Sequence, residues 1–179
     1  MTTEEIVGTA TEVAETLRRM GQGLSAQLAA RGIGGEEALL IGIHTGGVWV
    51  AEDIAAQLRA SAPVGRLNIA FYRDDFSRIG NHPTITPSVL PFPVDDRHVV
   101  LVDDILYTGR TIRAAMNEIF DHGRPASITL AVLVDRGERE LPIATDVSGM
   151  VLRLAPGESL KLRGPSPLTL HRVKTSRGP

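Results

Sequence analysis

The chain contains no cysteine, and this absence excludes several kinds of chemistry at once. Disulfide bonds, a thiolate nucleophile and a cysteine-ligated zinc site are all ruled out. Long apolar runs are missing too, and none approaches the roughly 20 residues that a membrane-spanning helix needs. The first residues are acidic and do not look like a secretory signal. We therefore expect a cytoplasmic protein without a membrane anchor.

The chain also lacks an excess of positive charge. It has 19 Lys and Arg residues against 21 Asp and Glu residues, which gives a net charge of −2. A protein covered in positive charge for general nucleic-acid binding is therefore not expected, although a local basic face remains compatible with this balance. A length of 179 residues with 42% hydrophobic residues is typical of one globular domain. We expect residues 1–179 to form that domain, with its core at about 38–163.

Short apolar runs alternate with stretches in which apolar residues recur at helical spacing. The runs predict strands at 38–43, 67–72, 98–102 and 127–134, and the spacing predicts helices at 6–28, 48–58 and 112–120. Strands that alternate with helices indicate an α/β fold with a mostly parallel central sheet flanked by helices. After residue 134 the pattern weakens into short apolar segments, and residues 174–179 are expected to be a frayed tail.

A polar stretch at 73–97 contains four prolines and is too long to be a simple connection in a compact domain. We expect a flexible loop that acts as a lid or binding arm, or that is disordered.

The segment VVLVDDILYTGRT, at residues 99–111, carries the strongest chemical signal. Ligands of open α/β sheets bind at the carboxyl ends of the strands, where this segment is expected to lie. Thr108, Gly109 and Thr111 would open a helix whose amino terminus binds phosphate, since its backbone N–H groups are unpaired. Asp103 and Asp104 suit the hydroxyl groups of a sugar. Any one of these residues alone is more simply a helix cap or a solvated strand end, but the whole string fits ribose 5-phosphate.

This string resembles the phosphoribosyl pyrophosphate (PRPP) signature of the type I phosphoribosyltransferases. Together with FYRDDFS and GRPASITLAVLVDRGERELPI, it resembles the pyrimidine operon regulator and uracil phosphoribosyltransferase family over about Leu39 to Leu162. The resemblance implies a type I fold with a small hood and a flexible loop. It also implies a transferase that converts uracil and PRPP to UMP and pyrophosphate, and a homodimer or larger homo-oligomer.

The resemblance further assigns roles to individual residues. It makes Asp103, Asp104 and Arg73 catalytic, with Arg73 carried on the mobile loop. The residues expected to bind PRPP are Asp103, Asp104, Ile105, Leu106, Tyr107, Thr108, Gly109, Arg110 and Thr111. Those expected to hold pyrophosphate are Thr45, Gly46 and Gly47, and those expected to bind uracil are Val134, Asp135, Arg136 and Leu160. Many relatives carry arginine where this chain has Gly46. Mg²⁺ would be bound with PRPP, through Asp103 or Asp104 if the protein contacts it at all.

Two other functions remain open at this point. One is a UMP-sensing regulator that binds pyrimidine operon mRNA and catalyses little, for which the chain offers Arg18, Arg19, Arg31, Arg139, Arg153, Lys161 and Arg163 as a basic surface. Ala144 and Met150 stand where basic residues are expected in the RNA-binding members. The other is a hypoxanthine or guanine phosphoribosyltransferase, which is disfavoured because Tyr107 replaces the aspartate of the purine enzymes.

Overall fold

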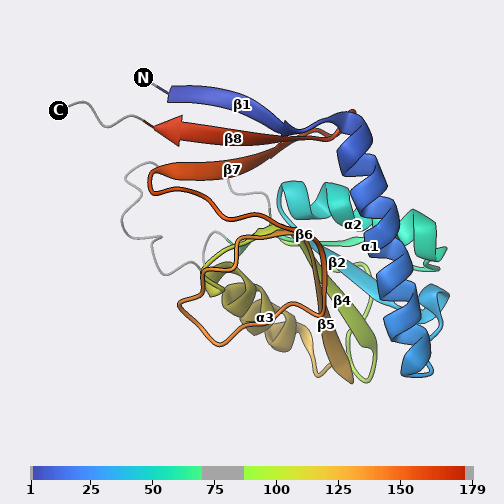
Figure 1. The fold of residues 1–179 in the computed structure, drawn as a ribbon. Helices are drawn as coiled ribbons and strands as arrows, with labels where there is room; N and C mark the ends of the chain where they lie inside the picture. The colour runs from blue at the N-terminus through green and yellow to red at the C-terminus, as the bar shows by residue number, and fades with distance from the viewer. Residues whose placement is uncertain (1, 70–86, 176–179) are drawn as a thin grey trace.

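The computed structural model describes residues 2–69 and 87–175, and within them the centre of the fold is a five-stranded parallel sheet (Figure 1). Its strand order is β3-β2-β4-β5-β6. The strand bounds are β2 Leu39–Ile43, β3 Gly65–Leu67, β4 His98–Leu106, β5 Ser127–Asp135 and β6 Val147–Val151. A short 3-10 helix, η1, covers Gly35–Glu37 ahead of β2.

Helices cover both faces of this sheet. Helices α1 (Ala10–Ala30) and α2 (Gly46–Leu58) pack on one face with strand residues such as Leu40 and Val100. Helix α3 (Arg110–His122) packs on the other face with Leu39, Ile41 and Leu101. Successive side chains of one strand point to opposite faces of the sheet and so pack in different cores. This explains why every residue of β2 other than its glycine has an apolar side chain. This arrangement confirms the predicted α/β architecture.

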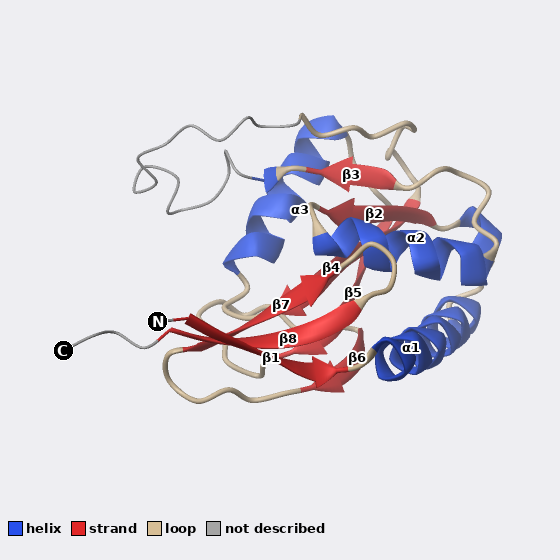
Figure 2. Cartoon of the chain, turned by 90° about the horizontal axis from the view of Figure 1, so that it is seen from above, coloured by secondary structure: helices blue, strands red, loops and turns tan. Residues whose placement is uncertain are grey.

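A second, antiparallel sheet forms the hood, which we define as strands β1 (Thr2–Gly8), β7 (Glu158–Arg163) and β8 (Thr169–Thr175), in the order β1-β8-β7. The two ends of the described chain lie side by side in it, as both views show (Figures 1 and 2). The sequence prediction was wrong at the amino end, because the helix does not start at Ile6. Thr9 and Glu12 form a capping box that starts α1 at Ala10, and Ile6 lies in β1.

Other boundaries also differ from the prediction. Strand β4 runs on to Leu106, so Asp103 and Asp104 lie inside it rather than after it. The expected strand at 67–72 is seen at Gly65–Leu67 instead. Asn68 and Ile69 are not part of a strand, and residues 70–72 lie outside the described residues. Strand β8 extends to Thr175, two residues into the expected frayed tail.

Of the expected flexible loop at 73–97, residues 87–97 belong to the described part of the chain. Val89 pairs with Arg66 of β3 through two backbone hydrogen bonds of 2.8 Å. Val94 is fully buried, and Leu90 and Phe92 pack on the same core. Burial of these apolar side chains explains why this part departs from the prediction. None of the helices in the described ranges is both long and apolar enough to span a bilayer.

Candidate active site

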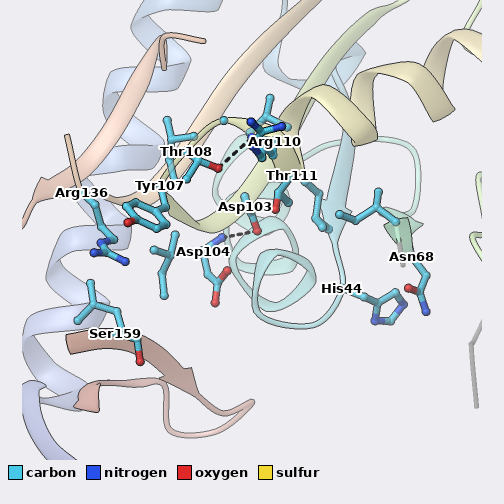
Figure 3. Close-up of a pocket in the computed structure, with 17 residues that line it drawn as sticks. His44, Asn68, Asp103, Asp104, Tyr107, Thr108, Arg110, Thr111, Arg136 and Ser159 are labelled. Atoms are coloured by element: carbon cyan, nitrogen blue, oxygen red, sulfur yellow. Dashed lines mark hydrogen bonds between the residues drawn. The ribbon is translucent and has the colours of Figure 1, made fainter. Parts of the chain in front are cut away.

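A cleft of about 820 Å³ opens at the carboxyl ends of the central strands. Its lining comes from the ends of β2, β3, β4 and β5 and from β7 of the hood. In Figure 3 the acid pair, Asp103 and Asp104, lies between Arg136 and Tyr107 on one side and His44 on the other. The cleft is therefore at the sheet edge where parallel α/β folds place their ligands.

The Thr-Gly turn, which we define as residues 107–111, connects β4 to the start of α3. Gly109 is the N-cap of α3 and has φ +92°, a conformation that favours glycine. The Thr108 hydroxyl accepts a hydrogen bond of 3.3 Å from the Arg110 N–H. The first turn of α3 contains no acidic residue. The positive end of the helix dipole and its leading N–H groups thus face the cleft without a competing carboxylate on that turn.

The acid pair projects from the last part of β4. Asp103 is only 5% exposed, and its Oδ1 accepts a hydrogen bond of 3.0 Å from the Asp104 N–H. Burial raises the pKa of Asp104, although hydrogen bonds from the Asp103 side chain and the backbone act in the opposite direction. A group that donates hydrogen bonds to this carboxylate would therefore relieve an unfavourable charge.

Residues 44–47 comprise the connection between β2 and α2, with a cis peptide bond between His44 and Thr45, and the first two residues of α2. The predicted pyrophosphate residues Thr45, Gly46 and Gly47 do not line the cleft. Gly46 packs against the Asp104 side chain, and Gly47 packs against the backbone of Asp103. A Cβ atom on Gly46 would collide with the Asp104 carboxylate. An arginine at position 46 would therefore require Asp104 to move.

His44 itself does line the cleft. Its backbone N–H donates a hydrogen bond of 2.8 Å to the carbonyl oxygen of Leu67. Burial, and secondly the positive charge of Arg66, lower the pKa of His44. The imidazole is therefore mainly neutral at pH 7.

Arg136 and Tyr107 form the opposite wall. The Arg136 guanidinium carbon lies 3.7 Å from the centroid of the Tyr107 ring, so the planar group is held over the ring face. Arg136 is 9% exposed, and its Nε atom is buried with no hydrogen-bond partner among the described residues. A buried, unpaired N–H costs about 1–3 kcal/mol, so a ligand oxygen that accepts from Nε would bind favourably.

The structure brings together many of the residues predicted from sequence. Those that line the cleft are Asp103, Asp104, Ile105, Leu106, Tyr107, Thr108, Gly109, Arg110, Thr111, Arg136 and Leu160. Val134 and Asp135 do not line it: Val134 is fully buried, and Asp135 Oδ1 accepts hydrogen bonds from Gly137 and Arg139. Arg73 lies outside the described residues.

Sequence reasoning left Asn68 and Ser159 out of the site, although both line the cleft. Asn68 directly follows β3, and the rule that strand ends carry ligands would have found it if that strand had been placed correctly. Ser159 belongs to the hood, and no local signal in the sequence relates β7 to the end of β4. The neighbouring Leu160 came only from the family resemblance.

The fold and the sequence together define the class of this protein. Residues 11–154 match the model of the phosphoribosyl transferase domain. A hypoxanthine-guanine phosphoribosyltransferase from Bacillus anthracis superposes with a TM-score of 0.64 at 15% identity, over 84% of this chain and 85% of that one. The hypoxanthine phosphoribosyltransferase of Trypanosoma cruzi gives 0.60 at 19% identity, over 84% and 83%. At such identities these structures confirm the predicted type I fold alone.

Curated relatives narrow the class further. The Bifunctional protein PyrR of Nitrosococcus oceani is 60% identical over 153 residues, which are 84% of this chain and 85% of that protein. The Bifunctional protein PyrR of Pseudomonas paraeruginosa is 56% identical over 159 residues, 89% of this chain and 92% of its own. The chain therefore belongs to the PyrR family of phosphoribosyltransferases, which confirms the predicted family and enzyme class.

Proposed function

We propose that the chain transfers the ribose 5-phosphate of PRPP to uracil and releases UMP and pyrophosphate. The observation that carries this proposal is the arrangement of one cleft. The acid pair lies at its centre, the Thr-Gly turn lies at the start of α3, and Arg136 lies beside Tyr107 on the wall across from His44. In this proposal they are a site for sugar hydroxyls, a site for a phosphate and a buried donor for a base carbonyl, and all three line one cleft.

In this proposal the Thr-Gly turn binds the 5-phosphate. Backbone N–H groups of the first turn of α3 and the hydroxyls of Thr108 and Thr111 are the donors. Asp103 and Asp104 accept hydrogen bonds from the ribose hydroxyls. Two carboxylates beside the ring also favour the positive charge that develops at C1 as the bond to pyrophosphate breaks. The ribose hydroxyls supply the donors that relieve the buried charge of Asp104.

Uracil would lie between the ribose and the wall formed by Arg136 and Tyr107. Its two carbonyl oxygens are acceptors, and Arg136 Nε is a buried donor without a partner among the described residues. The contact with the Tyr107 ring fixes the orientation of the guanidinium. We retain Val134, Asp135 and Leu160 as uracil-binding residues, the first two through their main-chain atoms.

The residues present fit a Mg²⁺ ion that is shared with the substrate. Across residues 2–69 and 87–175, no three acidic or histidine side chains gather as a self-sufficient metal site. Mg²⁺ at phosphate sites is usually held through one or two carboxylates together with phosphate oxygens and water, and Asp103 and Asp104 offer two carboxylates. The bound ion would neutralise charge on the pyrophosphate leaving group.

Pyrophosphate would lie near the amino terminus of α2. This helix begins at Gly46, next to Asp104, and helix amino termini attract anions. We keep Thr45, Gly46 and Gly47 as the pyrophosphate loop, and Arg73 as a residue that meets the same group. The role of Arg73 stays a prediction from sequence.

A panel of bases tests the proposal. Purified protein is incubated with PRPP and Mg²⁺ and with uracil, hypoxanthine, guanine, adenine or orotate, and the nucleotides are separated by chromatography. UMP from uracil alone is expected. IMP or GMP in its place would contradict the proposal and favour a purine enzyme, against which Tyr107 argues. An Asp104→Asn protein prepared in parallel shows whether any product comes from a contaminating host enzyme.

Regulation of pyrimidine operon mRNA is a second candidate, which the word Bifunctional in the relatives' name favours. Ion pairs within the chain reduce the positive charge of the basic surface that RNA binding would use. Arg18, Arg139 and Arg163 are each paired with a carboxylate at 2.6 to 2.8 Å. Ala144 and Met150 add no charge. We therefore place RNA regulation below catalysis.

A gel-shift titration against pyrimidine leader RNA tests the second candidate. Binding that rises with UMP and weakens steeply between two salt concentrations would establish it, because phosphate contacts release counterions. If no UMP-sensitive RNA binding were found, catalysis would be the only one of the two proposed functions left. The expected homodimer or larger homo-oligomer and the cytoplasmic location also stay predictions, the former tested by light scattering after size-exclusion chromatography.

A further inference from the structure

The post-β5 segment, which we define as the last residue of β5 and the residues after it, 135–143, lies directly against the Thr-Gly turn. The carbonyl oxygen of Thr108 accepts two hydrogen bonds from this segment, 3.0 Å from the Glu140 N–H and 3.1 Å from the Leu141 N–H. Arg110 Nε also pairs with Glu140 Oε2 at 2.7 Å. The turn assigned to phosphate binding is thus attached to the strand end assigned to base binding.

Arg139 connects the two parts of this contact with one side chain. Its Nη2 pairs with Asp135 Oδ1 at 2.7 Å, and its Nη1 donates to the Tyr107 carbonyl oxygen at 2.9 Å. Its Nε donates to the Ile143 carbonyl oxygen at 3.0 Å. The side chain is only 21% exposed. The planar guanidinium therefore holds the two ends of the post-β5 segment and the first residue of the Thr-Gly turn in one geometry.

Packing around Gly109 makes the turn sensitive to this geometry. A Cβ atom on Gly109 would lie 3.0 Å from Ile143 Cγ1 and 3.1 Å from its Cβ, so the turn backbone is close against Ile143. Arg139 holds the carbonyl group of that same residue. If residue 143 moved, the backbone of the Thr-Gly turn could move too, and its N–H groups would no longer be held in one position.

We propose that Arg139 is a positioning residue that holds the Thr-Gly turn in the form that binds the 5-phosphate of PRPP. It touches no substrate itself and acts through the Tyr107 and Ile143 carbonyl groups and through Asp135. This proposal rests on the proposed function, because it assumes that the turn binds the phosphate. It also gives Arg139 an internal role that is different from a contact with RNA.

Steady-state kinetics of Arg139→Met and Arg139→Lys test the proposal. A turn that is less well positioned loses phosphate binding equally in the ground and transition states, so KM for PRPP should rise with little change in kcat. We expect a rise of about tenfold, the equivalent of one lost hydrogen bond, while kcat stays within about twofold. Lysine keeps the charge but has one nitrogen for three acceptors, so it should behave like methionine.

Arg172→Met is the matched control, since Arg172 is paired with Glu5 at 2.7 Å in the hood and lies outside the cleft lining. It should leave all constants unchanged. Unchanged KM for PRPP in both Arg139 variants, a fall in kcat alone, or full recovery by lysine would overturn the proposal. A wild-type protein that makes no UMP would instead overturn the proposed function.

If the Arg139 variants do not fold, amide hydrogen exchange on the wild-type protein tests the same proposal. Coupling between two sites is reciprocal, so phosphate on the turn should stabilise the post-β5 segment. UMP is expected to slow exchange of the Glu140 and Leu141 amides as well as residues 107–111, whereas uridine should not. Protection of residues 107–111 without protection of Glu140 and Leu141 would overturn the proposal.

Discussion

Replacement of Gly46 by alanine should damage the site although it adds a single methyl group. The new Cβ atom would lie 2.6 Å from Asp104 Cγ and closer still to its Oδ2, whereas ordinary contact begins at 3.4 Å, so the carboxyl group must shift by at least about 0.8 Å. A displacement of about 1 Å at a reacting centre costs about a hundredfold in rate. We therefore expect kcat/KM for PRPP to fall by roughly thirty- to a hundredfold, or about 2–3 kcal/mol.

The assay is UMP formation at subsaturating PRPP, combined with thermal unfolding of the same samples. The melting temperature of Gly46→Ala should change little, because position 46 is helical and the damage is confined to the acid pair. Gly23→Ala is the matched control: its Cβ would meet nothing closer than Val147 at 3.8 Å. Alanine in the middle of α1 should keep full activity and add about 0.5–1 kcal/mol of stability. Full activity of Gly46→Ala would refute the claim that the position of Asp104 governs catalysis.

Three further predictions concern the acid pair and the turn. Asp104→Asn should abolish most UMP formation, because the amide offers one acceptor oxygen without charge, and initial rates measure this. Since burial raises the pKa of Asp104, its ionised form opposes folding above that pKa, and stability is gained as pH falls. Asp104→Asn should therefore melt no lower than the wild type at pH 8, and its relative advantage should shrink towards pH 4; a large loss at pH 8 would contradict this. Thr111→Ala, which removes one hydroxyl donor, should raise KM for PRPP about five- to tenfold with kcat nearly unchanged, and an unchanged KM would remove Thr111 from the phosphate site.

The central sheet could be predicted because its signal is local. The apolar runs of β2, β4 and β5 have side chains in both cores, one on each face of the sheet, and a short continuous apolar run is typical of such a buried strand. The hood could not be predicted in this way. Strand β1 is mostly exposed, and its pairing partner β8 lies at the other end of the chain, so neither periodicity nor neighbouring residues indicate it. The helical spacing of α1 was therefore extended too far, to Ile6.

The site was predicted where its residues are contiguous and missed where they come together only in the fold. The segment from Asp103 to Thr111 carries its chemistry in one string, and the structure places all nine residues at the cleft. Ser159 and Asn68 reach the same cleft from other strands. The contact between Gly46 and Asp104 is also tertiary. From sequence alone, Gly46 was notable only because many relatives carry arginine at this position. The structure shows in addition that the Asp104 side chain occupies the space beside Gly46.

A crystal structure of the protein with UMP tests the central claim most directly. We predict the 5-phosphate at the N–H groups and hydroxyls of residues 108–111, the ribose hydroxyls at Asp103 and Asp104, and a uracil carbonyl oxygen at Arg136 Nε. UMP bound elsewhere, or bound in this cleft with its phosphate away from the start of α3, would contradict the account.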